Sequence, residues 1–222
     1  MKGQHKLVMD TVQLQQGHPL YPAALQRFLG SNSPKTLTAL GNPNLLVGRA
    51  LALFCSVQCS GNIILKTYDL ACALRDAEIT VISGFHSPME KECLNLLLRG
   101  SQRVIVCAAR GIERMRLPSE WRKPFEEERL LLVSRFQSSE RRVTVDLAQQ
   151  RNDLVAAIAD KIFVAYAAPG SKTERFCRNV LSWGKPLLTL QSNENSHLIE
   201  LGGMPINIDN PGSLLPPRDV GL

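Results

Sequence analysis

The 222-residue sequence has few aromatic residues and no long apolar run, and we expect no signal peptide. Aromatic side chains make up 5% of the chain, so a bound nucleic acid would find few platforms for base stacking. The most apolar stretches, Leu51–Cys55 and Leu130–Val133, are far shorter than the ~20 residues that a membrane helix needs. Because the first residues also lack a continuous apolar core, we expect a cytoplasmic protein without a membrane partner.

Cysteine and histidine usage argues against a metal site. None of the six cysteines forms a Cys-x-x-Cys pair, and the four histidines are scattered along the chain. We therefore expect buried, reduced thiols, and neither a metal nor a cofactor. Apolar residues make up 44% and charged residues 21% of the chain, which is ordinary globular composition and excludes disorder as the main state.

The positive charge is unevenly distributed. The net charge is +6, and residues Arg99–Arg142 hold ten arginines and one lysine against six glutamates, a net +5 in 44 residues. A clustered basic surface favours a polyanionic partner through counterion release. The alternative is a solvated face on which Glu126–Glu128 pair with Arg122 and Arg129. At the level of the sequence both interpretations stay open.

Residues 1–47 differ from the rest of the chain. They contain four prolines and are predicted to form a helical or irregular N-terminal segment, with short helices at Ala23–Leu29 and Lys35–Leu40. Residues 48–207 are predicted to form the main domain, and the Pro- and Gly-rich residues 208–222 a loose C-terminal tail.

From residue 50 onward, apolar strands alternate with amphipathic helices. The predicted strands are Leu51–Cys55, Ile79–Ser83, Val104–Ala108, Leu130–Ser134, Ile162–Tyr166 and Pro186–Leu190. The predicted helices are Ile63–Asp76, Met89–Leu98, Ala148–Ile158 and Ser171–Leu181. Continuously apolar strands between helices indicate a parallel sheet buried on both faces, and hence an α/β fold with an extended Rossmann-like, doubly wound, mostly parallel sheet.

Ligands of such sheets bind beyond the carboxyl ends of the strands. This rule selects the loops Ser56–Asn62, Gly84–Pro88, Ala109–Ile112 and Ala167–Thr173. The candidate residues for binding nucleic acid or phosphate are Ser56, Gln58, Ser60, Gly61, Gly84, His86, Arg110, Arg151, Asn152, Gly170, Ser171, Lys172, Thr173 and Asn195.

Each of these signals also has a structural interpretation. Ser60 has the chemistry of a helix N-cap, and the segment Ala168–Thr173 lacks the Walker spacing, so it is either a phosphate nest or a capped helix start. Arg151 either reaches a phosphate or is a solvated arginine beside Asp153. No serine or cysteine nucleophile with a partner acid is evident near His86 in the sequence, which favours a loop histidine over a general base.

The order of these signals resembles the DNA-processing protein A (DprA, also called Smf) family, from about Gly17 to Gly203. The segments that carry the resemblance are Tyr21–Leu25, Pro34–Gly41, Val81–Gly84, Arg151-Asn152 followed by Ala157–Asp160, Gly184–Pro186 and Asn195–Gly203. The chain departs from the family where Cys55-Ser56-Val57 replaces GSR, Asp153 replaces the second arginine of RNR, and Pro169–Lys172 replaces SGSL. We also expect it to lack the winged-helix domain that many members carry.

The resemblance implies binding rather than catalysis: single-stranded DNA held on a basic pocket, a homodimer, and loading of a RecA-type recombinase during transformation. Lys172, Arg151, Arg110 and the basic segment Arg99–Arg142 would compensate for the lost arginines. One alternative is a module that senses a nucleotide or a nucleotide-derived signal and has no DNA role. Another is a scaffold that mediates protein contacts only.

Overall fold

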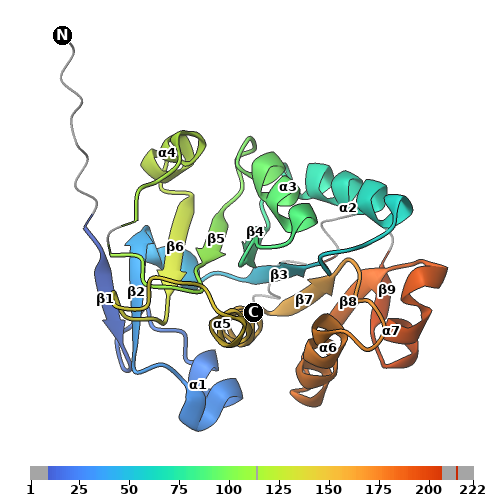
Figure 1. Cartoon of the computed structure of the whole chain (residues 1–222). Helices are drawn as coiled ribbons and strands as arrows, with labels where there is room; N and C mark the ends of the chain where they lie inside the picture. Colours follow the sequence, from blue (N-terminus) through green and yellow to red (C-terminus); the bar gives the residue numbers. More distant parts are fainter. Residues whose placement is uncertain (1–9, 114, 207–213, 215–222) are drawn as a thin grey trace, which may run out of the picture.

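The computed structural model describes residues 10–113, 115–206 and Leu214. Across these residues one nine-stranded sheet runs through the molecule in the order β1-β2-β6-β5-β4-β3-β7-β8-β9 (Figure 1). The strands are β1 (Val12–Gln15), β2 (Thr36–Gly41), β3 (Ala50–Phe54), β4 (Thr80–Ser83), β5 (Val104–Cys107), β6 (Leu130–Ser134), β7 (Lys161–Val164), β8 (Leu187–Leu190) and β9 (Met204–Ile206). Strands β3 to β9 are parallel, whereas β2 pairs antiparallel with both β1 and β6, so the expected mostly parallel α/β sheet is confirmed.

Helices cover both faces of the sheet (Figure 1). They are α1 (Ala24–Leu29), α2 (Gly61–Leu74), α3 (Pro88–Leu97), α4 (Ser119–Glu126), α5 (Val145–Ile158), α6 (Lys172–Ser182) and α7 (Ser196–Glu200). Two hydrophobic cores result, one beneath α2, α3 and α4 and the other beneath α1, α5 and α6. Strand β3 feeds both, because Leu51 and Leu53 point into the first core while Ala52 and Phe54 point into the second.

The chain order creates a reversal point between β3 and β7. From β3 the chain adds β4, β5 and β6 on one side, and it then crosses back along α5 to place β7 on the other side of β3. The loops after β3 and β7 therefore leave in opposite directions, which opens a crevice at the carboxyl edge of the sheet.

The predicted helix Lys35–Leu40 is wrong, because this segment forms β2. Four of its six residues are buried, and it lies between β1 and β6 with Leu37 and Ala39 in one core and Leu40 in the other. Strand pairing on both edges and burial on both faces override the local helical pattern. The predicted helix at Ala23–Leu29 is confirmed as α1.

Residues 1–47 thus contribute two strands to the main sheet in addition to α1. The division at residue 47 stays a prediction. Most of the predicted tail, 208–222, lies outside the described residues. The exception is Leu214, which is 3% exposed and packs into the core beneath α2 and α3.

Lysine 185 fastens α1 to the end of α5. The buried Lys185 ammonium group donates to the carbonyls of Ala156 (2.6 Å), Ala157 (2.9 Å) and Ala159, which are acceptors at the C-terminus of α5. The same nitrogen lies 4.2 Å from the centre of the Phe28 ring on α1. The Lys185 side chain therefore donates to the free carbonyl groups at the end of α5 and also holds α1 against this helix.

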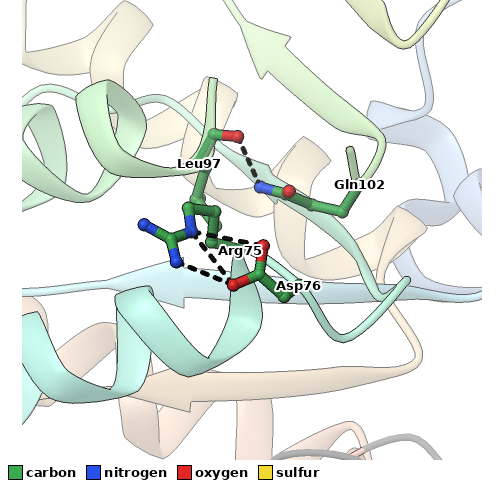
Figure 2. A network of polar contacts seen from close by, with 4 residues as sticks. All are labelled: Arg75, Asp76, Leu97 and Gln102. Atoms are coloured by element: carbon green, nitrogen blue, oxygen red, sulfur yellow. Dashed lines mark hydrogen bonds and ion pairs between the residues drawn. The ribbon is translucent and has the colours of Figure 1, made fainter. Parts of the chain in front are cut away.

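Gly100 lies in a tight turn before β5, at the amino-terminal edge of the sheet. A Cβ at Gly100 would lie 2.2 Å from the Arg75 carbonyl oxygen, so only glycine fits. Around this turn Arg75 binds Asp76 through Nη2 at 2.8 Å, and the Gln102 amide donates to the Leu97 carbonyl at 2.8 Å (Figure 2).

None of the described helices is long and apolar enough to cross a membrane.

Candidate functional site

A cavity of about 320 Å³ lies at the reversal point, at the carboxyl edge of the sheet. Its walls come from the loops after β3 and β4, the beginning of α5 and the beginning of α6. The lining residues are Phe54, Cys55, Val57, His86, Ser87, Glu90, Val145, Ala148, Gln149, Arg151, Asn152, Lys172, Thr173 and Phe176. Five of the sequence candidates are among them: His86, Arg151, Asn152, Lys172 and Thr173.

Arginine 151 is the buried cation of the cavity. Its residue is 5% exposed, Nε donates to Asn152 Oδ1 at 2.8 Å, and Nη1 donates to the Cys107 carbonyl at 3.3 Å. Burial lowers the pKa of the Arg151 guanidinium, and the charge of Glu90 opposes this shift. The side chain is therefore not solvated beside Asp153, and these two bonds leave its Nη2 group for a ligand.

Glycine 84 makes this position of Arg151 possible. A Cβ on Gly84 would lie 1.5 Å from Arg151 Nη1 and 1.9 Å from its Cζ, so any side chain here would displace the guanidinium. The glycine thus contributes to the site through the space it leaves.

Glutamate 90 accepts hydrogen bonds from backbone N–H groups at the end of β3 and just before α3. Its carboxylate accepts from the N–H groups of Cys55 (3.0 Å), His86 (2.7 Å) and Ser87 (3.3 Å). Ser87 Oγ accepts from the Glu90 N–H in return, which completes a capping box. Sequence reasoning missed Glu90 as a site residue, although the Ser87-x-x-Glu90 spacing before an apolar helix was a usable signal.

The Gly170 turn has the same arrangement. The Gly170 N–H donates to the carboxylate of Glu174, and Ser171 caps α6 by accepting from the Glu174 N–H at 3.2 Å. The hydrogen bond from Gly170 and the Arg178 guanidinium at 2.7 Å lower the pKa of Glu174, which therefore stays ionised. Of the two interpretations of this segment, the structure shows a capped helix start, with its anion position filled by the protein itself.

The serines after β3 are also used internally. The buried Ser56 hydroxyl accepts from the Ala168 N–H at 3.2 Å and so ties the β3 loop to the β7 loop. Ser60 is the N-cap of α2, which begins at Gly61; its hydroxyl accepts from the Ile63 N–H at 3.3 Å and donates to Glu194 at 2.7 Å.

Three other candidates lie away from the cavity lining. Gln58 is exposed in the loop before α2, and Arg110 is exposed after β5. Asn195 is fully buried, and its amide donates to the carbonyls of Ala165 (2.9 Å) and Leu190 (3.3 Å), which joins the ends of β7 and β8.

Both charged and apolar side chains line the cavity. Exposed Lys172 and buried Arg151 supply positive charge and Glu90 a carboxylate, while the apolar contacts come from residues that sequence reasoning did not select: Phe54, Val57, Val145 and Phe176. The two valines are 68% and 62% exposed, which is unusual for large apolar side chains beside a cavity. This combination suits a ligand with an anionic part and a flat apolar part.

The basic segment Arg99–Arg142 does not form a single surface. Because β5 and β6 are parallel, residues before and after them lie at opposite edges of the sheet. Arg99, Arg103 and Arg129 precede these strands, whereas Arg110, Arg135, Arg141 and Arg142 follow them. At the amino edge Arg129 pairs with Glu127 at 2.7 Å, as the salt-bridge interpretation expects, and a second cavity of about 660 Å³ there contains charges of both signs.

Comparison with known structures confirms the fold. DNA processing protein A from Streptococcus pneumoniae superposes with a TM-score of 0.76 at 17% identity, over 94% of this chain and 75% of that one. The protein of the same name from Helicobacter pylori gives 0.74 at 21% identity, over 93% and 96%. A molybdenum cofactor binding protein from Rippkaea orientalis is a more distant neighbour, with a TM-score of 0.53 at 10% identity over 75% of this chain and 94% of that one.

A search of curated protein sequences gives no significant match. The sequence model of the family described as DNA recombination-mediator protein A, in contrast, matches residues 13–204. This span contains every described strand except the one residue Val12 of β1 and the last two residues of β9, together with the whole cavity lining. The chain therefore belongs to the DNA recombination-mediator protein A family.

Proposed function

We propose that this protein binds single-stranded DNA at the carboxyl edge of its sheet and does no chemistry on it. The observation that carries the proposal is the cavity at the reversal point, which buried Arg151 and exposed Lys172 line together with apolar side chains. The family description and the Helicobacter pylori relative, whose structure concerns a single-stranded DNA binding mode, support the choice of ligand.

In this proposal side-chain cations, rather than backbone N–H groups, contact the phosphates. Glu90 and Glu174 fill the backbone donors that a phosphate would use at α3 and α6. Lys172 is free of such a partner among the described residues, and the exposed arginines Arg110, Arg141 and Arg142 extend the positive charge along the same edge. Binding that depends on long, solvated cations is strongly salt-dependent.

A binding role without catalysis agrees with the site. The His86 ring is exposed and has no hydrogen-bond partner among the described residues, so nothing orients it as a general base. Family membership supports the finer parts of the proposal, in which a cytoplasmic homodimer delivers the strand to a RecA-type recombinase during transformation.

A second candidate is a small nucleotide held in the same cavity. Its volume, about 320 Å³, lies at the lower end of the range for small-molecule sites. In addition, the Ser56–Ala168 hydrogen bond ties the loop after β3 to the loop after β7.

Fluorescence anisotropy of a labelled oligothymidine, titrated over a salt series, distinguishes the two candidates. We expect the logarithm of the binding constant to fall linearly with the logarithm of the salt concentration, with a slope of about −0.7 for each phosphate contacted. Duplex DNA and free nucleotides should compete poorly. Absence of binding at low salt would contradict the proposal that this protein binds single-stranded DNA. Displacement of the oligothymidine by a free nucleotide at low concentration would favour the second candidate.

A further inference from the structure

Two thiols lie in contact in the loop that forms one wall of the cavity. Cys55 directly follows β3 and Cys59 precedes α2, and the Cys55 thiol donates a hydrogen bond to the Cys59 sulfur at 3.9 Å. Both are free thiols, Cys55 buried and Cys59 half-buried. No other two cysteine sulfurs among the described residues are in hydrogen-bonding contact.

We propose that Cys55 and Cys59 are an oxidation site for hydroperoxides, where the two thiols close into a disulfide. The sulfur atoms must approach by about 2 Å to reach the usual S–S bond length of about 2.05 Å. The three residues between them belong to a loop, so no helix or strand has to break.

The reaction balances with one hydroperoxide. The Cys59 sulfur attacks the peroxide oxygen and becomes a sulfenic acid, while one molecule of water or alcohol leaves. The Cys55 sulfur then attacks Cys59, the S–S bond forms and the S–O bond breaks, and the hydroxyl leaves as water with the Cys55 proton. The two thiols lose two electrons, which the peroxide accepts.

Exposure sets the order of these steps. Cys59 reaches solvent, whereas Cys55 is 5% exposed, and burial raises its pKa far above the usual thiol range. The oxidant therefore meets Cys59 first, and Cys55 serves as the resolving thiol held beside it.

The bond also changes the cavity. The shortened loop carries Val57, which lines the cavity, and Ser56, whose hydroxyl holds the Ala168 N–H. Drawing the ends of the loop together moves the Val57 wall away from its reduced position. We expect weaker strand binding in the oxidised protein, a consequence that rests on the proposed function, whereas the disulfide itself does not.

Peptide mapping of the full-length protein tests the bond. Trypsin cuts after Arg49 and Lys66, so the peptide Ala50–Lys66 holds Cys55 and Cys59 and no other cysteine. After treatment with hydrogen peroxide, and then with iodoacetamide in denaturant, we expect this peptide to be unalkylated and lighter by two hydrogen atoms, and dithiothreitol to restore it. The peptide Thr67–Arg75, with Cys72 alone, is the internal control and cannot form this product.

The variant Cys55→Ser separates reactivity from pairing. It should accumulate a Cys59 sulfenic acid that dimedone traps, while the wild-type protein gives the disulfide at the same peroxide concentration. If Cys59 stays alkylatable in the variant, or if the wild type also gives the dimedone adduct instead of the disulfide, the proposal is wrong.

Anisotropy with oligothymidine then tests the consequence for binding. We expect the oxidised protein to bind more weakly than the reduced protein, and Cys55→Ser to lose this difference. A closed disulfide with unchanged affinity would overturn the coupling to the cavity. A reduced protein that binds no strand would count against the proposed function, and peptide mapping would still decide the disulfide.

Discussion

Substitution of Gly84 by alanine should remove Arg151 from the candidate site without changing any charge. The new Cβ would lie 1.5 Å from Arg151 Nη1, far inside contact distance, so the guanidinium has to leave its place over the end of β4. The backbone at Gly84 is not in the left-handed region, so the whole effect comes from this overlap.

The cost follows mainly from two lost hydrogen bonds, because the new methyl group meets the end of a flexible side chain that can move away. Moving Arg151 breaks its bonds to Asn152 Oδ1 and to the Cys107 carbonyl, although the displaced guanidinium regains water. We expect the free energy of unfolding to fall by about 1–3 kcal/mol and oligothymidine affinity to fall about tenfold, which corresponds to ~1.4 kcal/mol.

Gly100→Ala is the matched control at the opposite edge of the sheet. Its Cβ would lie 2.2 Å from the Arg75 carbonyl oxygen, so it should destabilise the fold at least as much. It lies far from the cavity lining, however, and should leave strand affinity unchanged. Urea unfolding gives the stabilities and anisotropy gives the affinities. Full stability and full affinity in Gly84→Ala would refute the reasoning, as would equal losses of affinity in the two variants.

Two further predictions concern buried side chains away from strand binding. Lys185→Met removes three hydrogen bonds at the end of α5 and should lower the free energy of unfolding by about 2–3 kcal/mol in urea; a loss below ~0.5 kcal/mol would contradict the anchoring role. Burial raises the pKa of Cys93, Cys107 and Cys177 to about 12, so these thiols should stay protonated and unmodified by a disulfide reagent in native protein at pH 8, while all six react in guanidinium; rapid native labelling of any of the three would contradict their burial.

The fold was largely predictable because its strands carry their own signal. Runs such as Leu130–Ser134 are apolar without alternation, which is typical of a strand in a sheet buried on both faces. The helix prediction for Lys35–Leu40 was wrong because this segment's own sequence does not decide its conformation. Its conformation depends on pairing with β1 and β6, whose residues lie about 25 and about 90 positions away in the sequence.

The site was predictable only in outline. The rule for the carboxyl ends of strands brought His86, Arg151 and Lys172 to one cavity. It could not show that Glu174 fills the Gly170 turn, because this depends on side-chain direction. Nor could it show that Asn195 joins two strand ends, since its partners are backbone carbonyls that any sequence supplies.

The most direct test of strand binding at the carboxyl edge compares Lys172→Glu with Lys123→Glu. Both variants change the net charge by the same amount, but Lys172 lies at the cavity and Lys123 at the amino edge of the sheet, where it is 82% exposed. The account predicts that Lys172→Glu weakens oligothymidine binding about tenfold and flattens the salt dependence by about one phosphate contact, while Lys123→Glu does neither. Equal effects of the two reversals, or a larger effect of Lys123→Glu, would contradict it.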